Sequence, residues 1–293
     1  MHPGYNYWIS MATIKTQQPP DLWLPEVCRV ADVRRHRAED VITLTLKHTV
    51  AGRVFRAGPG QFYMLYVPGI GEVPISISGL SSNGQQISHT IRAVGPVSEA
   101  LCRLRPGDPC GSRGPYGTGW PDDHHPDKPA VFIAGGLGMA PLKPALEDYL
   151  RGRGDGRRIY LLYGSRDPAG LLYEKETAAW QEAGVTVLRT VDVSAPGWDG
   201  PIGVVTNLIG RIREVLGEAR ILLCGPEIMM RFCLSSLQDT AADPSQIYLS
   251  MERNMKCAIG VCGHCQWGAD FICKEGPVFP SDRIAGKLHT KEL

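Results

Sequence analysis

The sequence predicts a multidomain protein: a β-barrel, then an α/β domain with a parallel sheet, then a small cysteine-bearing domain. The length of 293 residues suits about two domains of ordinary size. Short β-prone runs fill the first third, strand and helix patterns alternate in the middle, and four of the nine cysteines fall within residues 257–273. We place the boundaries at residues 1–24 for an N-terminal tail, 25–126 for the barrel, 127–244 for the α/β domain and 245–293 for the C-terminal domain.

The charge balance argues against a nucleic-acid-binding protein. Lys and Arg number 31 and Asp and Glu 30, a formal net charge of +1, whereas nucleic-acid binders usually carry a basic excess. No run approaches the roughly 18 apolar residues of a membrane span, and residues 1–20 lack the charged and apolar regions of a secretory signal. We therefore expect a cytoplasmic protein that neither spans a membrane nor binds nucleic acid.

Turn residues divide the segment from Glu26 to Tyr116 into short strands. The β-prone runs are residues 27–33, 41–46, 61–67, 75–78 and 86–94. A short helix is expected near residues 97–104. Short strands at this spacing favour a small barrel or a sandwich.

A proline-bearing linker at residues 121–129 precedes the α/β domain; its two histidines, His124 and His125, fit a solvated turn, with a metal site as the alternative. Apolar runs then alternate with helix-like stretches. We expect strands at 130–134, 158–163, 185–191 and 220–224, and helices at 141–150, 171–183, 204–216 and 228–237. This alternation predicts a parallel sheet that is covered on both faces.

Four cysteines near the C-terminus have the spacing of an iron–sulfur site. Cys257, Cys262, Cys265 and Cys273 form C-x4-C-x2-C followed by a fourth cysteine, which is the spacing of plant-type [2Fe–2S] sites. Such a cluster needs four thiolates in a small volume, and the glycines of this loop allow backbone N–H groups to face the sulfides. The spacing therefore predicts these four cysteines as cluster ligands.

Other interpretations of the cysteines stay open. Structural zinc prefers C-x2-C pairs, and the segment contains one such pair, Cys262 and Cys265. His264 can in principle replace a cysteine as a ligand. Disulfides require an oxidising compartment, and unrelated free thiols are a further alternative.

A glycine turn follows the first apolar strand of the α/β domain. Gly135, Gly136 and Gly138 stand between that strand and a helix, where glycines allow close backbone approach and a helix N-terminus stabilises phosphate. A tight strand-to-helix turn is the alternative. The segments 163–166 and 224–227 also follow strands and contain glycine, and ligands of such sheets bind at the carboxyl ends of strands.

The order of these motifs resembles the ferredoxin–NADP reductase superfamily. AGGLGMAP, YGSR and LCGPEIM follow the β-rich segment, and CAIGVCGHC stands near the C-terminus. Over about residues 25–285 the chain is similar to flavin- and [2Fe–2S]-carrying electron-transfer subunits. These are the gamma subunit of cytoplasmic nickel–iron (sulf)hydrogenases and the electron-transfer subunits of anaerobic sulfite reductase and dihydroorotate dehydrogenase. The segment MERNMKC at 251–257 looks most like the hydrogenase gamma group.

The resemblance implies that the barrel binds FAD. In the superfamily, a strand with R-x-[YF]-S or R-P-x-S contacts the flavin, and the matching strand here puts Pro74, Ile75 and Ser76 against the ring. Val73 stands in place of the arginine of that motif. Arg92 is therefore one candidate for the charge that binds the flavin phosphates.

Two further segments resemble flavin-binding turns. The segment 94–98, with Gly95, Val97 and Ser98, is similar to the pyrophosphate loop, which favours FAD over FMN; a Ser-capped helix is the alternative. The segment 113–117 is similar to the turn that closes the barrel beside the flavin, so Arg113 and Gly114 are candidates too.

In the α/β domain, the resemblance implies that the glycine turn cradles NAD(P). Cys224, Gly225 and Pro226 lie near the nicotinamide, with Cys224 as the candidate catalytic residue. Ser165 and Arg166 stand where the superfamily binds the adenosine ribose. A cation there pairs with the 2′-phosphate of NADP, but a plain surface charge is equally compatible with Arg166, and NAD stays open.

The implied cofactors form an electron path. Nicotinamide exchanges electrons as a hydride pair, an iron–sulfur cluster takes one at a time, and a flavin accepts both modes. The resemblance thus implies an NAD(P)H-linked flavin oxidoreductase subunit, a diaphorase that passes electrons to or from partner subunits of a redox complex. A nickel–iron hydrogenase, with large, small and iron–sulfur subunits, is the expected partner. Anaerobic sulfite reductase and dihydroorotate dehydrogenase are the alternatives, and a zinc-stabilised, non-enzymatic adaptor is the alternative from another class.

Overall fold

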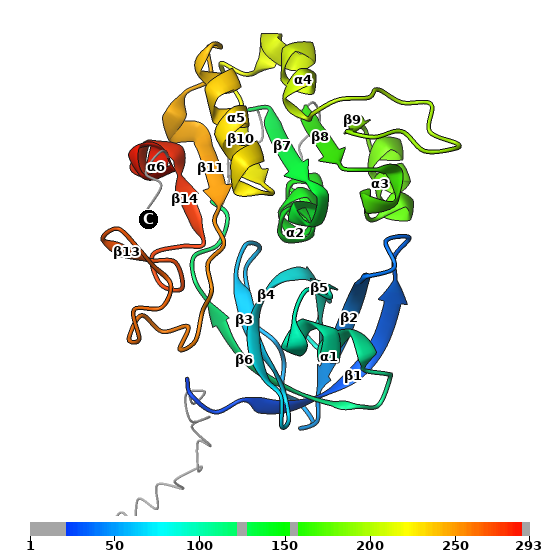
Figure 1. Ribbon diagram of the computed structural model, residues 1–293, viewed down its shortest axis with the longest axis vertical. Coiled ribbons are helices and arrows are strands. Elements are labelled where there is room, and N and C mark those ends of the chain that lie inside the picture. The colour runs from blue at the N-terminus through cyan, green and yellow to red at the C-terminus, as the bar shows by residue number, and fades with distance from the viewer. Residues whose placement is uncertain (1–21, 122–127, 153–157, 289–293) are drawn as a thin grey trace, which may run out of the picture.

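The computed structural model describes residues 22–121, 128–152 and 158–288. Most of the predicted N-terminal tail and most of the predicted linker, with its two histidines, lie outside these residues. The described chain forms a closed barrel, a six-stranded sheet with helices on both faces, and a C-terminal unit beside that sheet (Figure 1). This architecture confirms the predicted fold class.

The first unit is a closed barrel of six antiparallel strands in the order β1-β2-β5-β4-β3-β6. The strands are β1 (Glu26–Arg35), β2 (Val41–His48), β3 (Phe62–Val67), β4 (Gly71–Leu80), β5 (Gln86–Arg92) and β6 (Pro109–Tyr116). The helix α1 (Pro96–Arg103) follows β5. Closure removes the exposed strand edges of an open sheet.

Strand β6 was missing from the sequence prediction, which placed residues 113–117 in a turn. Glycines suit this strand because aromatic rings of β3 lie on it. A Cβ on Gly111 would stand 2.9 Å from the Tyr66 ring, and one on Gly114 would stand 2.9 Å from the Tyr63 ring. Aromatic packing against bare backbone thus makes a strand from residues that usually interrupt one.

The second unit is a six-stranded sheet in the order β14-β11-β10-β7-β8-β9. Its strands are β7 (Ala130–Gly135), β8 (Ile159–Ser165), β9 (Val185–Val191), β10 (Arg220–Cys224), β11 (Ile247–Ser250) and β14 (Val278–Pro280), of which only β14 is antiparallel to its neighbour. Val131 and Ile133 of β7 belong to one hydrophobic core, and Ala130 and Phe132 to another. Both faces of the sheet are therefore buried, as parallel sheets require.

The helices α2 (Met139–Arg151), α3 (Glu174–Glu182), α4 (Thr206–Ile209) and α5 (Glu227–Gln238) cover this sheet. One helix prediction was wrong: the single helix expected at 204–216 is the short α4 followed by a 3-10 segment at Gly210–Val215. Gly210 is a poor helix former, and Ile212, with φ −128°, interrupts the helical backbone.

The C-terminal unit shares its core with the α/β sheet. It contributes β11 and β14 to that sheet, and adds a hairpin of β12 (Gln266–Trp267) and β13 (Asp270–Phe271) and the helix α6 (Ser281–Leu288). Trp267 and Phe279 pack in the same core as Leu223 and Leu249. β11 and β14 follow the predicted domain boundary at residue 245, yet both belong to the sheet of the α/β domain. The boundary itself stays a prediction. No helix of the described chain is long and apolar enough to cross a membrane.

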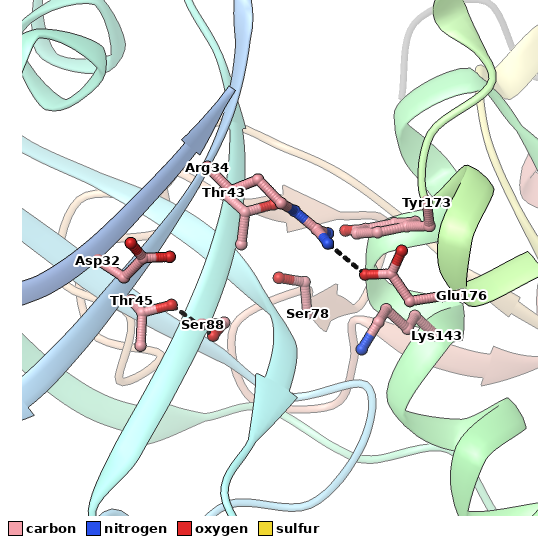
Figure 2. Close-up of a pocket in the computed structure, with 9 residues that line it drawn as sticks. All are labelled: Asp32, Arg34, Thr43, Thr45, Ser78, Ser88, Lys143, Tyr173 and Glu176. Carbon is pink, nitrogen blue, oxygen red and sulfur yellow. Dashed lines mark hydrogen bonds and ion pairs between the residues drawn. The ribbon is translucent and has the colours of Figure 1, made fainter. Parts of the chain in front are cut away.

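A small polar pocket of about 210 Å³ lies where the barrel meets α2 and α3 (Figure 2). Thr90 of β5 is the centre of a hydroxyl network beside it: its hydroxyl lies 2.8 Å from that of Thr43, 2.9 Å from that of Ser78 and 2.6 Å from that of Tyr173. Arg34 of β1 and Glu176 of α3 form an ion pair at the same pocket. These contacts hold the α/β domain against the barrel.

Replacing Tyr173 with phenylalanine should therefore lower the free energy of unfolding by about 1 to 3 kcal/mol, because it removes one partner of a buried hydroxyl network. Chemical denaturation of the two proteins measures the change. Tyr248→Phe is the matched control, since the Tyr248 hydroxyl has no hydrogen-bond partner in the described part of the chain. Equal stability of Tyr173→Phe and the wild type would contradict this role.

Candidate functional site

A cleft of about 750 Å³ lies between the barrel and the carboxyl ends of β7 and β10. Cavities of this size hold small-molecule ligands and cofactors. Eleven of the residues that the sequence assigned to cofactors line it: Pro74, Ile75, Ser76, Arg92, Ser98, Gly135, Gly136, Gly138, Cys224, Gly225 and Pro226. Segments far apart in the sequence thus meet at one place in the fold.

The glycine turn closes one side of the cleft by direct backbone contact. A Cβ on Gly138 would stand 2.5 Å from the carbonyl carbon of Cys224 and 2.7 Å from the nitrogen of Gly225. Gly136 has φ +52°, and nothing lies within 4 Å of the place where its Cβ would be. Close packing alone explains the glycine at 138, as expected for a tight strand-to-helix turn. At Gly136 the space is open, so the backbone there is available to a ligand.

The barrel side of the cleft is formed by residues 73–76 of β4. Behind this strand, the fully buried His89 of β5 lies with Nδ1 3.1 Å from the carbonyl oxygen of Ser76. Burial lowers the pKa of His89 to about 4, against the opposing effect of its backbone hydrogen bonds. The neutral ring therefore donates from Nδ1 to Ser76 and fixes the strand on which the flavin candidates stand.

The phosphate candidates Arg92 and Ser98 stand at another part of the same cleft. Arg92 Nε is buried without a hydrogen-bond partner among the described residues, although Asp40 Oδ2 lies 3.3 Å from it. Ser98 Oγ accepts hydrogen bonds from the backbone N–H groups of Val94 (3.0 Å) and Gly95 (3.1 Å), which is a capping arrangement at the start of α1. The Arg92 side chain lines the cleft, so its positive charge fits an anionic ligand such as a flavin phosphate.

Several candidates lie outside the lining of this cleft. Gly95 and Val97 stand at the start of α1, Val97 being half-buried, and Arg113 and Gly114 stand on β6. The Ser165 side chain is buried at the end of β8 and donates to the carbonyl of Asp167. Arg166 is exposed, and its backbone carbonyl accepts from the N–H of Val193 at 2.8 Å. An exposed arginine at this strand end is compatible both with a ribose phosphate and with a surface charge.

Cys224 ends β10 and faces the cleft while only 8% exposed. Burial raises its pKa to about 12, and the nearby Glu252 acts in the same direction. The side chain is therefore a neutral thiol at physiological pH. It can contact a ligand or exclude water, but it does not supply a thiolate nucleophile.

The C-terminal unit also lines the cleft, which the sequence analysis missed. Ser250, Met251, Glu252, Arg253, Asn254 and Met255 all contribute to its wall. Glu227, in the first turn of α5, accepts from Arg253 at 3.2 Å and from Arg231 at 2.6 Å, so an ion pair fixes this segment. The signal was present in the position of the segment, because residues that follow β11 leave the sheet at the same edge as the glycine turn.

This segment leads directly into the cysteine loop: Met255 lines the cleft, and Cys257 stands two residues further on. Two backbone contacts join cysteines of the loop: the N–H of Cys262 donates to Cys257 Sγ at 3.4 Å, and the N–H of Cys273 donates to Cys265 Sγ at 3.5 Å. Among the described residues, no group of three or more His, Cys, Asp and Glu side chains has the arrangement of a metal-ion site.

Backbone N–H groups point at these sulfurs. Val261 and Cys262 donate to Cys257 Sγ at 3.4 Å, and Gly260 donates to Cys273 Sγ at 3.1 Å. Positive φ angles at Ala258, Gly260 and Gly263 make these directions possible. Burial alone would raise the pKa of Cys257, but the N–H groups lower it to about 6. Backbone donors that stabilise the thiolate of Cys257 suit an iron–sulfur ligand, whereas burial and the neighbouring Cys265 raise the pKa of Cys273 to about 12.

Two parts of the chain match known domain families. Residues 132–235 match the oxidoreductase NAD-binding domain, which includes the glycine turn and Cys224. Residues 252–285 match the iron–sulfur cluster binding domain of dihydroorotate dehydrogenase B, which includes all four cysteines of the loop.

Whole-chain relatives agree with these domains. The chain is 35% identical to the sulfhydrogenase 2 gamma subunit of Pyrococcus furiosus over 77% of its own length and 83% of the relative. It is 35% identical to a probable electron-transfer subunit of dihydroorotate dehydrogenase B (NAD(+)) from Methanocella arvoryzae, over 77% and 80% of the two chains. Among solved structures, the NADH-dependent reduced ferredoxin-NADP oxidoreductase shares the fold, with a TM-score of 0.72, 23% identity and coverage of 90% and 94%.

The cleft, the glycine turn and the cysteine loop thus occur together in a chain whose relatives are subunits of redox complexes. The barrel and the parallel sheet have the ferredoxin reductase-like architecture. The cysteine loop lies within the part of the chain that matches the iron–sulfur cluster binding domain. The chain belongs to the ferredoxin reductase-like family of electron-transfer subunits, oxidoreductases with FAD, NAD(P) and an iron–sulfur cluster, together with the sulfhydrogenase gamma and dihydroorotate dehydrogenase B electron-transfer subunits.

Proposed function

We propose that this protein passes electrons between NAD(P)H and a nickel–iron hydrogenase, by way of FAD and a [2Fe–2S] cluster. One observation carries the proposal: the wall of the cleft continues into the loop of the four cysteines, with Met255 in the wall and Cys257 two residues later. The flavin supplies the conversion between hydride transfer and single-electron transfer. The protein supplies the two sites and holds them at a fixed separation.

In this proposal, the chain positions both redox partners without an acid–base residue. Pro74, Ile75 and Ser76 contact the flavin ring, and the neutral His89 holds their strand from behind. Arg92 binds the phosphates of FAD, helped by the start of α1. These residues position and bind the cofactors and do not act as acids or bases. The buried thiol of Cys224 and the neutral ring of His89 do not exchange protons at physiological pH.

The glycine turn binds the dinucleotide on the opposite wall. Gly136 offers its open face to the pyrophosphate, at the N-terminus of α2. Cys224 lies beside the nicotinamide and excludes water from it. The four cysteines bind the cluster, which requires reducing conditions, so the proposal places the protein in the cytoplasm.

Dihydroorotate dehydrogenase is the second candidate partner, because the cluster-binding part of the chain matches the domain of that enzyme. Affinity purification of the tagged chain from its native host, under anaerobic conditions, separates the candidates. Copurification of hydrogenase large and small subunits supports the first proposal. Copurification of a dihydroorotate dehydrogenase or a sulfite reductase catalytic subunit would replace it.

Arg166→Ala tests the choice of nucleotide. If Arg166 pairs with the 2′-phosphate, the variant should lose about tenfold in kcat/KM with NADPH and little with NADH, because charged hydrogen bonds contribute about 1.5–3 kcal/mol. Steady-state dye reduction with both nucleotides measures the ratio. Arg151→Ala, at the far end of α2, is the control. Equal losses with both nucleotides would show that Arg166 does not bind the 2′-phosphate.

A further inference from the structure

Arg113 is a buried cation that links the barrel to the cysteine loop. It stands on β6, and its side chain is only 4% exposed. One terminal nitrogen, Nη1, donates to the carbonyl oxygen of Cys257 at 2.7 Å, and the other, Nη2, donates to that of Lys256 at 2.8 Å. The guanidinium therefore binds two consecutive peptide carbonyls, one on each side of the Cα atom of Cys257, the first cysteine of the loop.

The same guanidinium is bound to the strand that lines the cleft. Arg113 donates to Glu72 from Nε at 2.8 Å and from Nη2 at 2.5 Å, and Glu72 directly precedes the cleft-lining residues 73–76 of β4. Nη1 also donates to the Tyr116 hydroxyl at 3.1 Å, and Tyr116 donates to the carbonyl of Leu22 at 2.7 Å. A bidentate pair of this kind fixes direction as well as distance.

These contacts account for the position of Arg113 without a bound phosphate. Guanidinium is always protonated in proteins, so a full positive charge lies beside the main chain of Cys257. One-electron reduction of a cluster adds one negative charge to it. A neighbouring cation stabilises the reduced form, and burial protects this interaction from screening by salt.

We infer that Arg113 is a positioning residue for the cluster, which holds the loop against the flavin-binding strand and raises the reduction potential of the cluster. The inference rests on the proposed function, since it needs the four cysteines to bind a cluster. Glu72 acts against it, because its carboxylate offsets part of the positive charge. The two residues of one ion pair should therefore shift the potential in opposite directions.

Potentiometric titration with dithionite as the electron donor, followed by EPR of the reduced cluster, tests this in the full-length protein. Arg113→Gln should lower the midpoint potential of the cluster. A tenfold change in the ratio of reduced to oxidised cluster corresponds to about 59 mV. Glu72→Gln should raise it, and Arg113→Lys, which keeps the charge, should lie between Arg113→Gln and the wild type. Arg158→Gln, which removes an exposed arginine at the start of β8, is the control and should leave the potential unchanged.

Opposite shifts in Arg113→Gln and Glu72→Gln support the inference, because a merely loosened loop shifts both in the same direction. Shifts of one sign, or no shift in either, would overturn it. If Arg113→Gln binds no cluster, the other two variants decide the question. A higher potential in Glu72→Gln supports the inference, whereas an unchanged potential in both Glu72→Gln and Arg113→Lys contradicts it. A wild-type chain without iron and sulfide would overturn the proposed function and this inference together, whereas a cluster insensitive to the variants would overturn the inference alone.

Discussion

Gly138→Ala is expected to reduce the rate at which NAD(P)H reduces the flavin by about a hundredfold. The added methyl group would stand 2.5 Å from the carbonyl carbon of Cys224 and 2.7 Å from the nitrogen of Gly225. Both atoms belong to the backbone at the end of β10, so the start of α2 and the end of β10 must move apart. A displacement of about 1 Å in such a site costs on the order of a hundredfold in rate, because the reacting groups lose their alignment.

Anaerobic stopped-flow mixing with NADPH and NADH measures this rate through the bleaching of the flavin. Gly210→Ala is the matched control: Gly210 has φ −60°, and nothing lies within 4 Å of the place of its Cβ. The control should keep its rate and its flavin. A Gly138→Ala protein that reduces its flavin as fast as the wild type would show that the glycine turn does not bind the dinucleotide.

Cys265→Ser is expected to abolish the iron–sulfur cluster. Cys265 is 3% exposed, and its sulfur accepts the N–H of Cys273 at 3.5 Å. Serine offers a hard oxygen in place of a soft thiolate, so the cluster loses one of four iron–sulfur bonds to the protein.

The loss should appear as missing iron and sulfide and as a lost long-wavelength absorbance, while the flavin bands remain. Cys102→Ser is the control, because Cys102 lies in α1 of the barrel, far along the chain from the loop. If the cluster signal of Cys265→Ser survives intact, these four cysteines are not the ligands.

The features that could be predicted from the sequence are local ones. The spacing of Cys257, Cys262 and Cys265 is set by one loop, and positive φ at Gly260 and Gly263 follows from glycine itself. The alternation of strands and helices after residue 130 has a clear hydrophobic signal, since both faces of β7 are buried. Such features depend on neighbours in the chain, which a sequence displays directly.

The features that could not be predicted depend on contacts between distant segments. Strand β6 exists because aromatic rings of β3 lie on its glycines, and no pattern within β6 itself indicates this. Arg113 was one candidate for the charge that binds the flavin phosphates, and nothing in the sequence indicated its contacts with Glu72 and the carbonyls of Lys256 and Cys257. A separation of 144 residues between Arg113 and Cys257 hides such a contact from any local sequence pattern.

The central claim is that one chain binds both the flavin and the cluster and that NAD(P)H reduces them in turn. An anaerobic visible titration of the purified protein with NADPH, with iron, sulfide, zinc and flavin measured on the same sample, tests it most directly. We predict FAD and about two irons per chain, with the flavin and cluster bands both bleached by the nucleotide. A colourless protein with about one zinc ion and no flavin would contradict the claim.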